Sequence, residues 1–115
     1  MGGRIASYVV AAGADVAALA LFAYPLHPPG RPEQRRDAHL PRITAPALLC
    51  CGDRDVYASA DELRELTKML PRARLHVLQG ADHSFSVLKA SGQRREDVWQ
   101  EAVDALVSFI DEELS

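Results

Sequence analysis

The sequence predicts an α/β fold in which three parallel strands are flanked by helices. Two observations support this class. Apolar runs of strand length fall at 16–24 and 47–51, and a third short strand is predicted at 74–78. Stretches with helical spacing of apolar residues separate or follow these segments. Alternation of strands and helices along a chain is typical of a parallel sheet. At 115 residues, the chain (1–115) is expected to form a single domain.

The N-terminal part contains one predicted helix, one predicted strand and a proline-rich segment. The spacing of apolar residues predicts a helix over residues 2–12 that ends at Gly13. The uncharged run 16–24 predicts a buried strand, with a helix as the alternative because of its alanines. Six prolines then fall within the proline-rich segment (residues 25–46). They exclude long regular elements and leave room for a short helix near residues 33–39.

A predicted strand and the loop after it supply the first candidate catalytic group. Residues 47–51 are uncharged and too few for a helix, so we expect a buried strand that ends at Gly52. Asp55 then lies at the carboxyl end of that strand, where ligands and catalytic side chains collect in open parallel sheets. Ser59 and Glu62 form a Ser-x-x-Glu capping box, which predicts the start of a helix. The apolar face of this helix consists of Leu63, Leu66 and Leu70.

The second candidate group follows the next strand. Residues 74–78 predict a strand that opens into a loop carrying His83. Because neighbouring parallel strands end at the same edge of a sheet, Asp55 and His83 are expected to face each other, as an acid that orients an imidazole base. A solvated loop carboxylate and a structural loop histidine are the alternatives for these two residues. A final helix with one apolar side is predicted over residues 93–114.

The remaining histidines and acidic groups have weaker claims to function. The side chains of Asp53, Asp55 and His83 are of the types that bind metal ions. Positions at strand ends account for these residues without a metal, so we expect no metal and no cofactor. His76 lies within a predicted strand and is expected to be a packing or edge residue. His27 and His39 fall in the proline-rich segment, where a functional role is the less favoured interpretation.

Composition and charge exclude several classes of partner. The net charge is −3 and the basic residues are spread through the chain, so we expect no nucleic-acid binding. The most apolar window is much shorter than the ~20 residues of a spanning helix, and the N-terminus lacks a secretory pattern. We therefore expect no membrane association and a cytoplasmic location. Cys50 and Cys51 are neighbours in a strand, so their sulfurs are expected to point to opposite faces as free thiols.

Two short motifs and one longer segment resemble a known family. Gly52-Asp53-Arg54-Asp55 resembles the G-x-x-D at the end of the seventh strand of α/β-hydrolases, and Gly80-Ala81-Asp82-His83 resembles their histidine loop after the eighth. Residues 24–30, followed by Arg36 and His39-Leu40, are similar to small dienelactone-hydrolase-like proteins, the KANL/Tex-like hydrolase domain. The resemblance covers nearly the whole chain. It implies a hydrolase of the serine esterase type, with Asp55 as triad acid and His83 as triad base.

The resemblance also implies where the chain stands in that fold. In this subgroup Met-Gly-Gly-Arg directly follows the nucleophilic serine of G-x-S-x-G, and here the same tetrapeptide occupies residues 1–4. We therefore expect the nucleophile immediately before Met1 and the backbone of Met1 in the oxyanion hole. Five further strands are expected upstream of it. The 115 residues are then the C-terminal portion of an α/β-hydrolase fold and are expected to be inactive alone.

Substrate and partners follow from the same expectation. The intact protein is expected to act on a small ester-like substrate. An uncovered strand at the edge of a small parallel sheet is a template for pairing, so self-association through that edge is expected. The alternative function is a non-catalytic interaction module that keeps the α/β-hydrolase scaffold without its chemistry.

Overall fold

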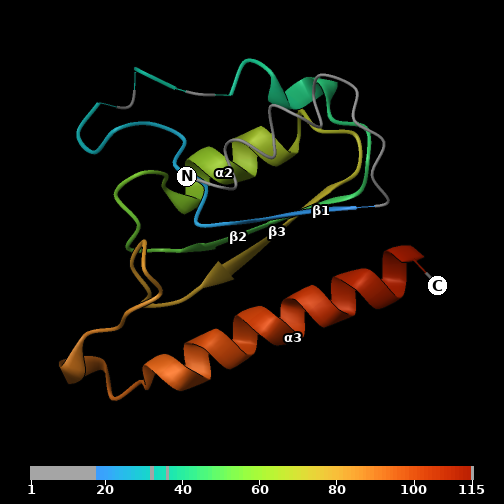
Figure 1. The fold of residues 1–115 in the computed structure, drawn as a ribbon. Helices are drawn as coiled ribbons and strands as arrows, with labels where there is room; N and C mark the ends of the chain where they lie inside the picture. The colour runs from blue at the N-terminus through green and yellow to red at the C-terminus, as the bar shows by residue number, and fades with distance from the viewer. Residues whose placement is uncertain (1–17, 32, 36, 115) are drawn as a thin grey trace.

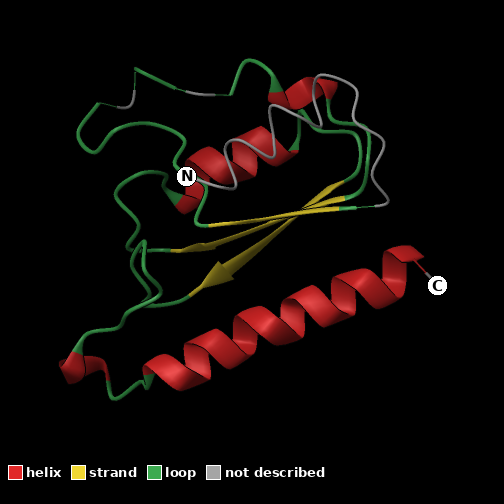
Figure 2. Ribbon diagram, viewed as in Figure 1, coloured by secondary structure: helices red, strands yellow, loops and turns green. Residues whose placement is uncertain are grey.

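Three parallel strands form the centre of the molecule. The structure is a computed structural model that describes residues 18–31, 33–35 and 37–114. Strands β1 (Leu19–Phe22), β2 (Ala47–Gly52) and β3 (Ala73–Leu78) lie side by side in that order, all parallel. Helix α2 (Ala60–Thr67) covers one face of the sheet and α3 (Arg95–Leu114) lies along the other, as Figures 1 and 2 show. The prediction of three parallel strands with flanking helices is confirmed.

Each face of the sheet has its own apolar core. β2 is buried along its whole length because both of its faces are covered, and successive residues point to opposite sides. Leu49 and Cys51 belong to the core beneath α2, whereas Cys50 belongs to the core beside α3. Other members of the α2 core are Tyr24, Leu26, Leu40, Ile43, Leu63, Leu66 and Leu70. Other members of the α3 core are Leu78, Ala81, Phe85, Val98 and Ala102.

The two cysteines are free thiols on opposite sides of β2, as predicted. Burial raises the pKa of Cys50 to about 12 and the pKa of Cys51 to about 11. Both thiols are therefore protonated at neutral pH. Since the thiolate is the reactive form of cysteine, these residues act as small apolar groups of the core.

The capping box fixes the start of α2. Ser59 Oγ accepts a hydrogen bond from the Glu62 N–H at 3.1 Å, and Glu62 Oε1 accepts one from the Ser59 N–H at 2.9 Å. The two bonds satisfy donors that the first turn of a helix leaves without partners. The predicted helix start is confirmed, and the face with Leu63 and Leu66 packs on the sheet.

Removing the capping hydroxyl is expected to destabilise the protein. We predict that Ser59→Ala lowers the free energy of unfolding by about 1 kcal/mol, because the Glu62 N–H loses its acceptor. Urea unfolding followed by circular dichroism measures the change. Ser59→Asp keeps a capping oxygen and is the control. Its free energy of unfolding should lie within a few tenths of a kcal/mol of that of the native chain. An unchanged unfolding midpoint in Ser59→Ala would contradict the role given to this cap.

The proline-rich segment differs from the sequence-based expectation. The sequence left room for at most a short helix near residues 33–39, and the described residues there form separate turns. One turn is closed by the Gln34 N–H on the Arg31 carbonyl, and another by the Leu40 N–H on the Asp37 carbonyl. A short 3₁₀ helix, η1 (Leu40–Arg42), follows instead, and its first turn contains a proline, where the missing N–H costs no hydrogen bond.

Three predicted boundaries also shift. β1 occupies only part of the predicted run 16–24 and ends at Phe22, before Ala23, whose φ of 52° lies in the left-handed region. α2 ends at Thr67, three positions before the expected residue 70, and α3 begins at Arg95 instead of residue 93. The helix predicted over residues 2–12 lies outside the described residues.

Two findings bear on possible partners. Among the residues that the structure describes, no helix has both the length and the apolar character needed to cross a membrane. Within the same residues, β1 is an outer strand of the sheet with β2 as its neighbour. The self-association expected through this edge stays a prediction.

Candidate active site

The first part of the site is the acid loop (residues 53–59), which joins β2 to α2. Asp55 ends a turn that begins at Gly52, and its N–H donates to the Gly52 carbonyl at 3.2 Å. Its side chain is completely buried. Asp55 Oδ1 accepts a hydrogen bond of 2.7 Å from the Tyr57 N–H, which leaves Oδ2 for another donor. The carboxylate is therefore held in one orientation by the backbone of its own loop.

The second part is the histidine loop (residues 79–87), which follows β3. Its ends are joined by an antiparallel bridge between Ala81 and Val87. Inside the loop, Asp82 Oδ1 accepts from the N–H groups of Ser84 and Ser86 at 2.9 and 3.0 Å. Phe85 adopts a φ of 61° and buries its ring in the α3 core. These local bonds and the buried ring fix the loop that carries His83.

The two loops bring the acid and the imidazole into contact. His83 Nδ1 lies 2.8 Å from Asp55 Oδ2, and the histidine side chain remains 35% exposed. Because an ionised carboxylate can only accept, Nδ1 must carry the proton. In the neutral ring Nε2 is then an unprotonated nitrogen, able to accept a proton from a reacting group. The ring of Tyr57 packs against the imidazole with ring centroids 4.3 Å apart.

Close backbone contacts hold the acid loop and the histidine loop together. Asp53 Oδ1 accepts from the Gly80 N–H at 2.8 Å, and the Arg54 guanidinium donates to the Gly80 carbonyl at 3.0 Å. The Arg54 N–H donates to the Ala81 carbonyl at 2.9 Å. A side chain at Gly52 would place its Cβ only 2.1 Å from that same carbonyl oxygen. Asp53 is exposed, and its carboxylate joins the two loops through the Gly80 N–H.

Sequence analysis missed the contribution of three residues. Arg54 and Tyr57 had no assigned role, although one connects the two loops and the other touches both Asp55 and His83. Gly52 was expected only to end a strand. A glycine at such a position often marks a close approach of backbone, which is the signal that could have indicated the contact with Ala81.

The other candidate histidines have side-chain partners or positions different from those of the acid and imidazole. His76 Nε2 is 2.6 Å from Glu101 Oε2 of α3, which fits the edge role expected of it. His39 is buried just before η1. His27 pairs with Glu62. Met1, the expected oxyanion-hole residue, lies outside the described residues.

The described residues around the pair do not form a metal centre, and the cavity between β3 and α3 lies elsewhere. Within the described part of the chain, no group of three or more histidine, cysteine or acidic side chains could hold a metal ion. A cavity of about 350 Å³ lies between β3 and α3, and its lining includes Arg74, His76 and Glu101. Neither Asp55 nor His83 lines it.

Comparison with known proteins agrees with this architecture. The family model described as "Alpha/beta hydrolase domain" matches residues 1–111, and the chain belongs to that family. Solved structures with the same fold include Est1E from Butyrivibrio proteoclasticus, with a TM-score of 0.57 and 15% identity, over 91% of this chain and 58% of that one. A second structure, ferulic acid bound to Est1E, gives a TM-score of 0.58 and 14% identity, over 91% and 56%. The chain therefore spans a little more than half of the proteins it matches.

Proposed function

We propose that the chain carries the acid and base of a serine hydrolase that cleaves esters or related acyl bonds. The contact between His83 Nδ1 and the buried Asp55 carboxylate carries this proposal. A buried carboxylate on one imidazole nitrogen, with the other nitrogen at a partly exposed position, is the arrangement of acid and base in a Ser-His-Asp triad.

The proposed chemistry assigns one role to each residue. His83 Nε2 takes the proton of the serine hydroxyl as the hydroxyl attacks the acyl carbon, and later gives that proton to the leaving alcohol. Asp55 fixes the tautomer and orientation of the ring and stabilises the imidazolium formed in between. The nucleophilic serine is proposed to lie immediately before Met1, whose backbone N–H would then contribute to the oxyanion hole.

The test is covalent labelling by a fluorophosphonate probe, which reacts with activated serines. We expect the 115-residue chain to remain unlabelled. We expect labelling of a chain extended at its N-terminus by the residues encoded upstream of Met1, if these include the G-x-S that the family places there. Replacing that serine by alanine should abolish the label.

Two results would contradict the proposal. An in-frame stop codon directly upstream of Met1 would remove the proposed nucleophile, and an extended chain that folds but resists the probe would favour the non-catalytic interaction module. For the labelled enzyme, a panel of aryl and alkyl esters can then define the substrate. Esters of ferulic acid belong in that panel because Est1E binds this acid.

A further inference from the structure

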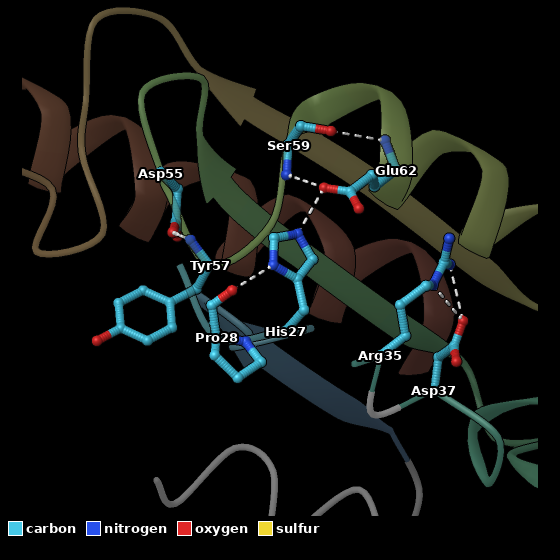
Figure 3. Close-up of polar contacts among 8 residues, drawn as sticks. All are labelled: His27, Pro28, Arg35, Asp37, Asp55, Tyr57, Ser59 and Glu62. Atoms are coloured by element: carbon cyan, nitrogen blue, oxygen red, sulfur yellow. Dashed lines mark hydrogen bonds and ion pairs between the residues drawn. The ribbon is translucent and has the colours of Figure 1, made fainter. Parts of the chain in front are cut away.

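A buried histidine outside the proposed pair connects the proline-rich segment to the acid loop. His27 is 5% exposed, and its ring lies between Pro28 and the start of α2, as Figure 3 shows. Nδ1 is 2.9 Å from the Pro28 carbonyl oxygen, and Nε2 is 2.9 Å from Glu62 Oε1. The acyl transfer proposed above does not use this ring.

Both partners of the His27 ring are hydrogen-bond acceptors. A carbonyl oxygen carries no proton, and Glu62 Oε1 already accepts a bond from the Ser59 N–H. Each of the two contacts therefore requires an N–H on the imidazole. A neutral ring has one N–H and would turn a lone pair toward one of the two oxygens. Both contacts are satisfied together only by the imidazolium, which makes His27 and Glu62 a partly buried ion pair.

The pKa directions of the pair agree with this protonation state. Burial alone lowers the pKa of His27, but the hydrogen bonds to Pro28 and Glu62 and the charge of Glu62 outweigh it and leave the pKa above the ordinary 6.5. Burial alone raises the pKa of Glu62, but bonds from Ser59 and His27 bring it below the ordinary 4.5. Arg35 also acts on His27 and lowers its pKa, and this guanidinium is itself paired with Asp37.

The sign of the pH dependence follows from these directions. Since the folded-state pKa of His27 lies above that of the unfolded chain, its contribution to stability is complete below pH 6.5 and is lost as pH rises through the folded-state value. The contribution of Glu62 is complete above pH 4.5 and is lost as pH falls through its lowered value. The ion pair is therefore strongest between these two limits.

His27 also holds the peptide that supports the acid. The backbone N–H of His27 donates to the Tyr57 carbonyl at 3.0 Å, and the backbone N–H of Tyr57 donates to Asp55 Oδ1 at 2.7 Å. On the other side of Tyr57, Glu62 binds both the His27 ring and the Ser59 N–H. The acid loop is thus attached to the proline-rich segment in its middle and at its end. Figure 3 shows Glu62 in contact with both the His27 ring and the Ser59 N–H, and Tyr57 bound to Asp55.

We propose that His27 is a positioning residue for the Asp55–His83 pair, kept as an imidazolium by Glu62 and holding the Tyr57 peptide that binds Asp55. The proposal rests on the proposed function only in treating that pair as catalytic. Loss of the His27 proton turns a ring lone pair onto the Pro28 or Glu62 oxygen. The acid loop then loses one attachment, and the Asp55–His83 contact loses order as the pH rises through the raised pKa of His27.

Nuclear magnetic resonance of the ¹⁵N-labelled 115-residue chain tests the protonation state. We expect both ring nitrogens of His27 to be protonated at pH 6.5 and the ring to titrate above that pH. Glu62→Gln removes the charge but keeps the capping box, because glutamine also accepts from the Ser59 N–H. It should lower the titration midpoint of His27 by about one pH unit. Glu65→Gln is the matched control, since Glu65 lies on the same helix and pairs with Lys68 instead.

A second measurement tests positioning. We expect His27→Phe, which keeps a ring but removes both donors, to speed amide exchange at Tyr57 by about tenfold and to broaden the Nδ1 proton signal of His83. The Glu62→Gln variant should reproduce both effects at a pH above the lowered titration midpoint of its His27 ring. The test therefore stands even where His27→Phe does not fold. Glu65→Gln should leave both signals unchanged.

The outcomes separate this inference from the proposed function. A His27 ring with one protonated nitrogen at pH 6.5 would overturn the inference. So would Tyr57 exchange and a His83 signal that remain native in Glu62→Gln at that higher pH. If the extended chain is not labelled by the fluorophosphonate and the resonance results are as expected, the proposed hydrolase function is contradicted. The role of His27 in ordering the acid loop would then still stand.

Discussion

Asp55→Asn is expected to lower kcat of the extended hydrolase by about 10⁴-fold. The replacement has nearly the same shape, so the completely buried position stays filled. The Tyr57 N–H requires an acceptor at the position of Oδ1, which fixes the asparagine oxygen there and turns its NH₂ toward His83. His83 Nδ1 must then accept, and the ring proton moves to Nε2. An imidazole with a proton on Nε2 cannot deprotonate the serine.

The change of tautomer and the loss of rate can be measured separately. Ester hydrolysis by the extended chain gives kcat, and ¹⁵N resonances of His83 in the 115-residue chain report which ring nitrogen is protonated. Asp61→Asn is the matched control, because it makes the same change of charge on a side chain that is 94% exposed and is paired with Arg64. A decrease in kcat of less than tenfold in Asp55→Asn, with His83 in the new tautomer, would contradict the role of Asp55 as the triad acid.

The sequence predicted the parts of this site that depend on short stretches of chain. The uncharged run at 47–51 predicted β2, and the Ser59 capping box predicted the start of α2. Because both neighbouring strands are parallel, their ends met at one edge, and the predicted meeting of Asp55 and His83 followed. The catalytic roles of these two residues stay proposals.

The contacts that sequence analysis missed join segments that are far apart in the chain. His27 and Glu62 are separated by 35 positions, and no periodic pattern relates them. The proline-rich segment gave a second difficulty. Prolines exclude long regular elements but do not specify where single turns fall, so the sequence left room for a short helix where the described residues form separate turns. Such contacts depend on how the segment folds back over α2, which local pattern does not determine.

Gly52→Ala is expected to destabilise the protein by roughly 3 kcal/mol, through steric overlap. An added Cβ would lie 2.1 Å from the Ala81 oxygen, 2.5 Å from the Ala81 carbonyl carbon and 2.9 Å from the Asp82 oxygen. All three atoms belong to the backbone of the histidine loop, so no side chain can rotate away. Relief requires a shift of that loop, which also carries His83. We therefore expect urea unfolding to show the lower stability, and the His83 Nδ1 proton signal to weaken in the fraction that remains folded.

Gly30→Ala is the control that separates overlap from backbone strain. Gly30 has a φ of 75°, which disfavours alanine, but among the described residues beyond its two chain neighbours no atom lies within 4 Å of an added Cβ there. Its replacement should therefore cost only about 1 kcal/mol, from the left-handed backbone alone, and should leave the His83 signal unchanged. Equal destabilisation by the two substitutions would show that the histidine loop yields easily to Gly52. The close approach at Ala81 would then not be what holds His83 against Asp55.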